Sequence, residues 1–391
     1  MIETIKKQVG GDRAIWAVVL LLALLSVLVV YSSIVTLAYK YQDGNTFYYL
    51  FRHGIFVAIG FGIIYMIHRV KHKYFSRIAQ LAVMIAIPLL AITLLAGNDI
   101  NHAKRWLTIP VINQSFQTSD LAKLALIMYV ARILAVRKNE LGDFQRGFLP
   151  LVIPIFLVVG LILPANLSTA ILVFTCCLVL MFIGRVPMKY IAATVGVAGA
   201  GAMMVISLGA LAPEVFPRFK TWQSRIMAFT SDAADSDRDY QRDQSMIAIA
   251  TGGITGKAPG NSTQRNFLPH PYSDFIFAII LEEYGLIGGT GVVVLYLILM
   301  FRAIRIARGS PGSFGSFLVI GITFTLVFQG MINMAVAVGL MPVTGQPLPM
   351  VSMGGTSIWF TCVAIGIVLS VSRSLENNTT TTSNAPKNAT A

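Results

Sequence analysis

Charged residues are scarce in this chain. Asp, Glu, Lys and Arg make up 12% of the 391 residues, whereas hydrophobic residues make up 55%. A soluble domain carries about 25% charged residues, so the composition excludes an ordinary soluble fold. Apolar runs of about 20 residues recur, and each is long enough to cross a bilayer core of about 30 Å. Alternation with a period of two is absent. The sequence therefore predicts an all-α polytopic membrane protein with one membrane domain.

Cysteine is also rare. Cys176, Cys177 and Cys362 are the only three cysteines, and all of them fall in predicted spans. Neighbouring cysteines on a helix cannot easily bridge each other, and no predicted loop holds a cysteine. We therefore expect neither a disulfide framework nor a zinc site.

Ten apolar segments predict about ten transmembrane helices. They cover residues 14–36, 49–68, 75–96, 119–136, 148–163, 168–185, 189–211, 275–301, 314–338 and 356–373. One large loop, 212–273, separates spans seven and eight. The polar, low-complexity segment 377–391, NNTTTTSNAPKNATA, predicts a disordered cytoplasmic tail.

Basic residues are distributed unevenly between the two sides of these spans. Of the 30 Lys and Arg residues, 18 lie on the side that holds both termini. The short loops of the opposite side hold four, which are Lys40, Arg52, Lys104 and Arg105. The positive-inside rule then places both termini in the cytoplasm. Topology accounts for the net charge of +13, so we expect no nucleic-acid partner.

Two segments outside the spans have an unusual composition. The stretch VFPRFKTWQSRIMAF (215–229) mixes aromatic residues with Arg218 and Arg225, which is typical of a helix in the membrane interface. It is either one anchor of a solvated loop or a lid over a lipid head-group site. The stretch GLMPVTGQPLPMVSMGGTS (339–357) holds three prolines and four glycines. Broken backbone of this kind predicts a re-entrant segment that lines a polar cavity.

Ionisable residues gather near the extracytoplasmic ends of the spans. Asp274 stands directly before an apolar run, where it either serves as a helix N-cap or has a functional role. Lys123 lies about one turn inside the fourth span. It can pair with Asp120 on its own helix or reach across to Asp274. Arg105, beside Trp106, is either an interfacial anchor or part of a site.

Glu282 and Glu283 lie inside the same apolar run as Asp274. On one continuous helix, Glu283 would stand about 13 Å from Asp274 and about 180° around the axis. Two carboxyl groups of a glycosidase lie about 5–9.5 Å apart, so these residues do not form such a pair with Asp274. We expect both glutamates to lie deeper in the membrane in a structural or cavity-lining role.

Three motifs resemble those of one known family. LPHPYSDFIFAIILEEYGLIG resembles LPE-x-x-TDFIFA-x-x-x-EE-x-G, and GLMPVTGQPLPMVSMGGTS resembles LPVTG-x-PLP-x-x-SYGGSS. NHAKRWL with FQTSDLAK resembles N-x-A-x-RW with FQPSEL-x-K. The chain is thus similar to the SEDS family (FtsW, RodA and SpoVE), with residues 1–376 as the SEDS membrane domain. GNSTQ (260–264) is closer to the FtsW branch.

The resemblance implies a GT-C-like fold and a peptidoglycan glycosyltransferase of the bacterial cytoplasmic (inner) membrane. Such an enzyme polymerises lipid II into β-1,4 glycan by an inverting single displacement at the outer leaflet, here for septal wall synthesis. It implies Asp274 as the catalytic base, with a divalent cation, Mg or Mn, as a candidate ligand. The implied partners are a class B penicillin-binding transpeptidase and other division or elongation proteins.

Further residues are expected at the site. Substrate binding is expected of motif residues Lys104, Arg105, Lys123, Gln264 and Ser352, and of the large-loop residues Arg218 and Arg225, which are available to balance the charge of the leaving diphosphate. Those implied for a structural or cavity role are Glu282, Glu283, Pro349, Gly354 and Gly355.

The chain departs from the family pattern at several positions. Thr118 stands at a proline position and Asp120 at a glutamate position; Asn166, Ser168 and His270 replace an aspartate, a glycine and a glutamate. Two other functions also fit the intramembrane charges and broken helices, namely a lipid flippase or transporter and a non-catalytic scaffold for a penicillin-binding protein. Clustering of the unusual chemistry at the outer ends favours catalysis there.

Overall fold

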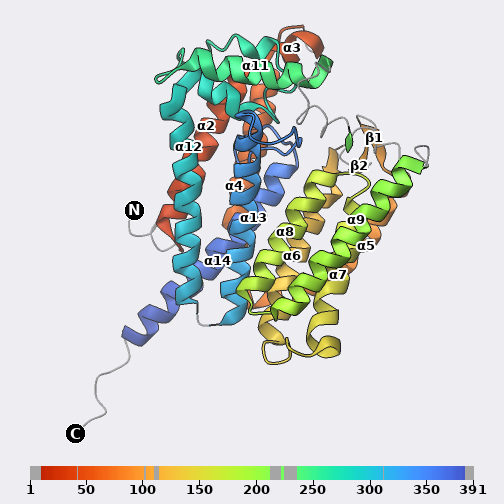
Figure 1. Ribbon diagram of the computed structural model, residues 1–391. Coiled ribbons are helices and arrows are strands. Elements are labelled where there is room, and N and C mark those ends of the chain that lie inside the picture. The colour runs from red at the N-terminus through yellow and green to blue at the C-terminus, as the bar shows by residue number, and fades with distance from the viewer. Residues whose placement is uncertain are drawn as a thin grey trace.

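The computed structural model describes residues 10–41, 43–100, 103–109, 114–211, 222–223, 236–310 and 312–383 (Figure 1). Most of them are helical. The long helices are α2 (Arg13–Ser33), α4 (Thr46–Ile67), α5 (His72–Ala96), α6 (Thr118–Val136), α7 (Leu149–Ile162), α8 (Leu167–Ile183), α9 (Met188–Leu211), α11 (Ser236–Gly252), α12 (Ile276–Gly309), α13 (Ser313–Ala337) and α14 (Ser357–Ser383). Shorter elements are α3 (Val35–Tyr41), the π-helical turn η1 (Phe144–Phe148) and the 3₁₀ turn η2 (Gln264–Asn266).

Each of the ten predicted spans is helical in the structure. Within the described residues, eight helices are long and apolar enough to cross a membrane. Helix α8 is apolar but shorter, with 17 residues. Helix α6 carries three charged side chains, Asp120, Lys123 and Arg132. The prediction of an all-α polytopic membrane protein is confirmed.

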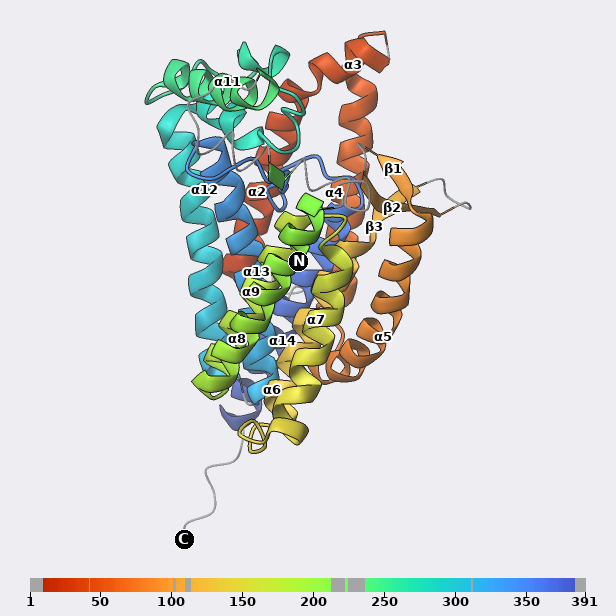
Figure 2. The same cartoon turned by 45° about the vertical axis from the view of Figure 1, so that its right-hand side comes forward.

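The two described ends of the chain meet at one end of the bundle. The backbone N–H of Gly11 donates to Glu376 Oε2 at 2.8 Å, and Arg302 Nε donates to Asp12 Oδ2 at 2.8 Å. We call this the terminal end. Helix α11, helix α3 and a small sheet lie at the opposite end, which we call the loop end (Figures 1 and 2). Both chain ends therefore lie on the same side of the bundle.

A three-stranded antiparallel sheet stands at the loop end, between α5 and α6. Its strands are β1 (Asn98–Ile100), β2 (Ala103–Ile109) and β3 (Gln114–Gln117), in the order β1-β2-β3. Trp106 on β2 is paired with Gln117 on β3. Period-two alternation is absent from the sequence, and the sheet is a small addition to an otherwise helical fold. Strands of three to seven residues are too short for period-two alternation to stand out against the surrounding spans.

Helix α12 reverses direction within its first third. Gly285 has φ 67° and ψ −168°, a conformation that favours glycine. A Cβ at Gly289 would lie 2.4 Å from Leu281 Cδ2 and 3.4 Å from Phe277 Cζ. In a straight helix, residues 277 and 289 would stand about 18 Å apart. Residues 276–284 therefore run back along the long part of α12 as the first arm of a hairpin.

The stretch between α13 and α14 enters the bundle. Ser26 Oγ, two turns inside α2, donates to the carbonyl of Val351 at 2.7 Å. The Tyr296 hydroxyl of α12 donates to the carbonyl of Pro349. Both contacts place this stretch among the helices, as its prolines and glycines predict.

Two segments of the chain differ from the prediction. Helix α14 continues to Ser383, so the tail is not irregular from residue 377 onward. No proline or glycine interrupts the chain between 377 and 383, and the buried part of the helix can propagate through it. Part of the predicted large loop, 212–273, is also helical, because Ser236–Gly252 form α11. The predicted interfacial helix at 215–229 lies outside the described residues, apart from 222–223.

Candidate functional site

A polar cavity of about 410 Å³ opens at the loop end. Its lining residues are Arg105, Trp106, Ser115, Gln117, His270, Tyr272, Ser273, Asp274, Gly345, Pro347, Met353, Gly354 and Ser357. They come from three segments far apart in the sequence: the sheet, the turn before α12, and the stretch before α14. The structure thus brings the three motifs together around one cavity. Among the described residues that line it, Asp274 is the only carboxylate and Arg105 the only Arg or Lys side chain.

The sheet forms one wall of this cavity. Strand β2 carries Arg105 and Trp106, and its partner strand β3 carries Ser115 and Gln117. A hydroxyl pair between Thr108 and Ser115, with oxygens 2.9 Å apart, joins the two strands. The Thr356 hydroxyl donates to the carbonyl of Ser115 at 3.1 Å, which connects the sheet to α14.

Asp274 lies in the turn before α12 and is partly buried. The helix begins at Ile276, with Phe275 at the cap position and no side-chain cap hydrogen bond. Asp274 is therefore not the N-cap residue of α12. Ser273 Oγ donates to Asp274 Oδ1 at 3.1 Å. A Cβ at Gly345 would lie 3.7 Å from Asp274 Oδ2, so the backbone there passes beside the carboxylate.

Ser352 is 2% exposed, and its hydroxyl is engaged within the protein. Its Oγ donates to the carbonyl of Ser273 at 2.6 Å and accepts from the N–H of Leu348 at 2.8 Å. The substrate-binding role expected for Ser352 is therefore replaced by a structural link. Nearby, Met353 N–H donates to the carbonyl of Tyr272 at 2.9 Å, Gly354 lines the cavity, and Gly355 has φ 54°.

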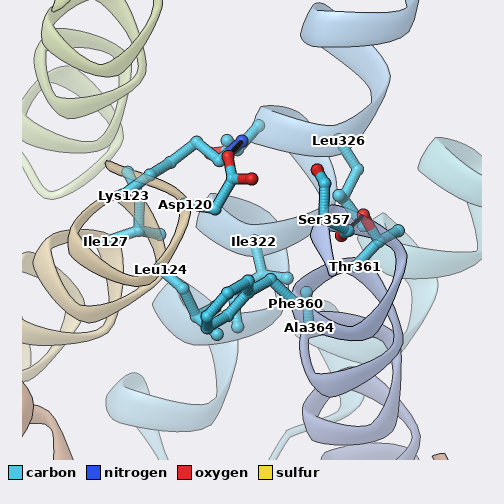
Figure 3. Close-up of a pocket in the computed structure, with 11 residues that line it drawn as sticks. Asp120, Lys123, Leu124, Ile127, Ile322, Leu326, Ser357, Phe360, Thr361 and Ala364 are labelled. Atoms are coloured by element: carbon cyan, nitrogen blue, oxygen red, sulfur yellow. Dashed lines mark hydrogen bonds and ion pairs between the residues drawn. The ribbon is translucent and has the colours of Figure 1, made fainter. Parts of the chain in front are cut away.

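Lys123 pairs on its own helix. Its Nζ donates to Asp120 Oδ1 at 3.3 Å and to Gln329 Oε1 of α13 at 2.8 Å. Asp120 and Lys123 line a second, smaller cavity of about 30 Å³ between α6, α13 and α14 (Figure 3). Lys123 thus pairs with Asp120 rather than with Asp274, because its side chain turns toward Asp120 and Gln329. Ser357 lines both cavities, so they are neighbours.

Glu282 and Glu283 lie toward the loop end rather than deeper in the bundle, because the first arm of α12 runs toward that end. Glu282 accepts from Lys257 Nζ at 2.8 Å and from the N–H of Thr263 at 3.1 Å. Glu283 accepts from the Ser32 hydroxyl in the last turn of α2. The glutamates are 0% and 1% exposed, so the expected structural role fits but the expected depth is wrong.

Three other predicted binding residues lie elsewhere. The N–H of Gln264 donates to Glu282 Oε2 at 3.2 Å, and Gln264 is absent from the cavity lining. Lys104 belongs to β2, but its side chain lies outside the described part of the structure. Arg218 and Arg225 also lie outside the described residues.

Sequence reasoning overlooked Gln329 and Asn333 on α13. Both are buried, and their side chains reach the two segments beside Asp274: Gln329 Nε2 donates to the carbonyl of Pro347 at 2.9 Å, and Asn333 Nδ2 donates to the carbonyl of Asp274 at 2.9 Å. Two amides four residues apart inside an apolar span were the available signal, because polar groups in spans are costly and usually functional.

Comparison with known proteins identifies the family. The family model for FtsW, RodA and SpoVE, described as cell cycle protein, matches residues 12–377. The chain belongs to the FtsW/RodA/SpoVE family. It is 32% identical to stage V sporulation protein E of Bacillus subtilis, over 94% of this chain and 98% of that protein. It is 33% identical to a probable peptidoglycan glycosyltransferase FtsW of Geobacter sulfurreducens, over 93% of this chain and 96% of that protein.

Solved structures show the same fold. A chain of a peptidoglycan synthase complex matches with a TM-score of 0.69 at 24% identity, over 93% of this chain and 98% of that one. The rod shape determining protein RodA of Thermus thermophilus matches with a TM-score of 0.64 at 24% identity, over 93% of this chain and 97% of that one.

Two residues that depart from the motifs of the FtsW/RodA/SpoVE family have defined places in the structure. Asn166 is the N-cap of α8, and its Oδ1 accepts from the N–H of Thr169 at 3.1 Å. Asparagine and aspartate cap helices about equally well, so this replacement preserves the local structure. His270 is exposed at the cavity, with φ 55°, and its Nδ1 lies 3.2 Å from the Tyr272 hydroxyl.

Proposed function

We propose that this chain is a peptidoglycan glycosyltransferase that polymerises lipid II into β-1,4 glycan for septal wall synthesis. The observation that carries the proposal is the cavity at the loop end, which joins one carboxylate, Asp274, with one cation, Arg105. Several relatives that align with more than 90% of this chain are named probable peptidoglycan glycosyltransferase FtsW.

The arrangement suits an inverting single displacement. Asp274 accepts the proton of the acceptor sugar's 4-hydroxyl while that oxygen bonds to the donor's C1 and the bond from C1 to the diphosphate oxygen breaks. Carboxylates are weak bases for alcohols, so proton transfer accompanies bond formation. Arg105, whose side chain lines the same cavity, balances the charge that develops on the leaving undecaprenyl diphosphate. One carboxylate suffices, because the displacement is direct and the diphosphate leaves without protonation by a second carboxylic acid.

The site would hold a divalent cation through Asp274 together with oxygens of the substrate. No group of three His, Cys, Asp or Glu side chains occurs among the described residues, so a cage made of protein groups alone is not formed there. Mg²⁺ is commonly held by one or two carboxylates together with substrate phosphates. Asp274 would supply the carboxylate, and the donor diphosphate would supply the remaining oxygens. A cation bound in this way would neutralise charge on the diphosphate.

The test is polymerisation of lipid II by purified Asp274→Asn protein, read on a glycan gel. We expect loss of polymer at unchanged folding. Asp143→Asn is the matched control, because Asp143 accepts from two backbone N–H groups at 2.8 and 2.9 Å before η1, far from the cavity, and asparagine caps equally well. Full polymerisation by Asp274→Asn would reject the catalytic assignment and favour a scaffold or a lipid transporter.

The partner and the cellular location belong to the same proposal. A class B penicillin-binding transpeptidase is the proposed partner, supported by the fold likeness to a chain of a peptidoglycan synthase complex. Division or elongation proteins would join it. The chain would lie in the bacterial inner membrane with both termini in the cytoplasm, supported by the basic residues near the terminal end and by the Gly11–Glu376 contact. Co-purification of a tagged transpeptidase with this chain tests the partner.

A further inference from the structure

Two amide side chains on one face of α13 hold both backbone segments that flank the Asp274 carboxylate. Asn333 Nδ2 donates to the carbonyl of Asp274 at 2.9 Å and to the carbonyl of Gln346 at 2.8 Å. Because one NH₂ group has two N–H donors, a single side chain bridges the turn before α12 and the stretch before α14.

The second amide lies one turn away on the same face. Gln329 Nε2 donates to the carbonyl of Pro347 at 2.9 Å, and its Oε1 accepts from Lys123 Nζ at 2.8 Å. Gln329 therefore links the buried Lys123–Asp120 pair to Pro347, which lines the cavity. The amides are 4% and 1% exposed, so neither can contact solvent freely.

The segment between these contacts passes directly beside the carboxylate. Gly345 has φ 66°, and a Cβ there would lie 3.7 Å from Asp274 Oδ2. Gln346, the next residue, is held from its other side as well, because its Nε2 donates to Thr169 Oγ1 of α8 at 2.8 Å. The position of the carboxylate in the cavity thus depends on helices α6, α8 and α13, none of which carries it.

We propose that Gln329 and Asn333 are positioning residues for Asp274, and that Lys123 acts on the site through Gln329 rather than by pairing with the carboxylate. The inference rests on the proposed glycosyltransferase function. Apolar replacement of Asn333 leaves two buried carbonyls without a donor, so the two segments separate or take up water. A displacement of about 1 Å at a catalytic group lowers turnover by about 100-fold.

The test combines kinetics with local hydrogen exchange. Asn333→Leu removes both donors at similar size, and Gln329→Leu tests the second contact independently. We expect the kcat for lipid II polymerisation to fall about 100-fold with little change in KM, and amide exchange to quicken in 272–276 and 343–349 while α5 and α7 keep their protection. Ser370→Ala is the matched control, since the buried Ser370 hydroxyl donates to the carbonyl of Val70 near the terminal end.

The outcomes separate this inference from the proposed function. Wild-type kcat in Asn333→Leu, or exchange that rises equally in all helices, would overturn the positioning role. If Asn333→Leu fails to fold, Gln329→Leu decides by the same two measurements. If the wild-type protein makes no polymer, the proposed function fails, and the exchange pattern still shows whether the amides hold the Asp274 turn.

Discussion

At the scale of single residues, the carboxylates of this chain differ chiefly in their partners. Glu282 is bound by Lys257 and by several donors from the segment before α12, while Glu283 is bound by Ser32. Asp274 instead lies at a cavity of about 410 Å³. Within ten residues of one apolar run, two carboxylates are thus buried links and a third, Asp274, lines a cavity. The partners, rather than the residue type, decide the role.

The Lys123–Asp120 pair allows a prediction on stability. The two side chains are 11% and 8% exposed, so removing one leaves a buried charge without its partner. Lys123→Met should lower the free energy of unfolding by about 3–5 kcal/mol. The double variant Asp120→Asn with Lys123→Met should lose less than the single one, because no charge is then left unpaired. Thermal denaturation of the wild-type protein, Lys123→Met, Asp120→Asn and the double variant, all in one detergent, measures this double-mutant cycle. Additive losses would show that the pair is not coupled.

At the scale of elements, the sequence predicted helices much better than it predicted how they turn. Apolar runs of about 20 residues are a strong signal, and all ten produced helices. The hairpin in α12 could not be inferred, because the apolar run resumes after Gly285 and the preceding Glu282 and Glu283 do not by themselves mark a turn. What requires glycine there is a tertiary contact, since a Cβ at Gly285 would lie 2.2 Å from the carbonyl of Ile254. The hydrogen bonds of Lys123 to Asp120 and Gln329 likewise depend on how α13 packs against α6.

A methyl group at Gly285 should therefore destabilise the hairpin. Gly285→Ala combines a φ of 67° with a clash against the Ile254 backbone, so the turn must open. We expect the hairpin to be displaced and the unfolding temperature to fall, with losses of several kcal/mol from strain and overpacking. Gly291→Ala is the control on the same helix, because a Cβ there meets no atom within 4 Å. Equal melting temperatures for the two variants, measured in detergent, would contradict the assignment of Gly285 as an obligatory turn.

At the scale of the whole molecule, the terminal and loop ends carry different chemistry. The terminal end holds the joined ends of the described chain and most of the basic residues that the structure describes, whereas the loop end holds the sheet, α11 and the cavity. Under the proposed function, the cavity must lie on the side of the membrane where lipid-linked sugars are presented. The proposed function and the distribution of basic residues are independent arguments, and both predict that the loop end faces away from the cytoplasm.

Orientation can be measured with introduced cysteines. The native Cys176, Cys177 and Cys362 are each 0% exposed, so they give little background with an impermeant maleimide. Asn266→Cys places a thiol at an exposed position of the loop end. Gly142→Cys places one at an exposed position before η1, where a Cβ meets no atom within 4 Å. We expect Asn266→Cys to react in intact spheroplasts and Gly142→Cys to react only after the membrane is permeabilised. The reverse pattern would put the cavity in the cytoplasm, where a base for wall polymerisation would have no acceptor glycan to act on.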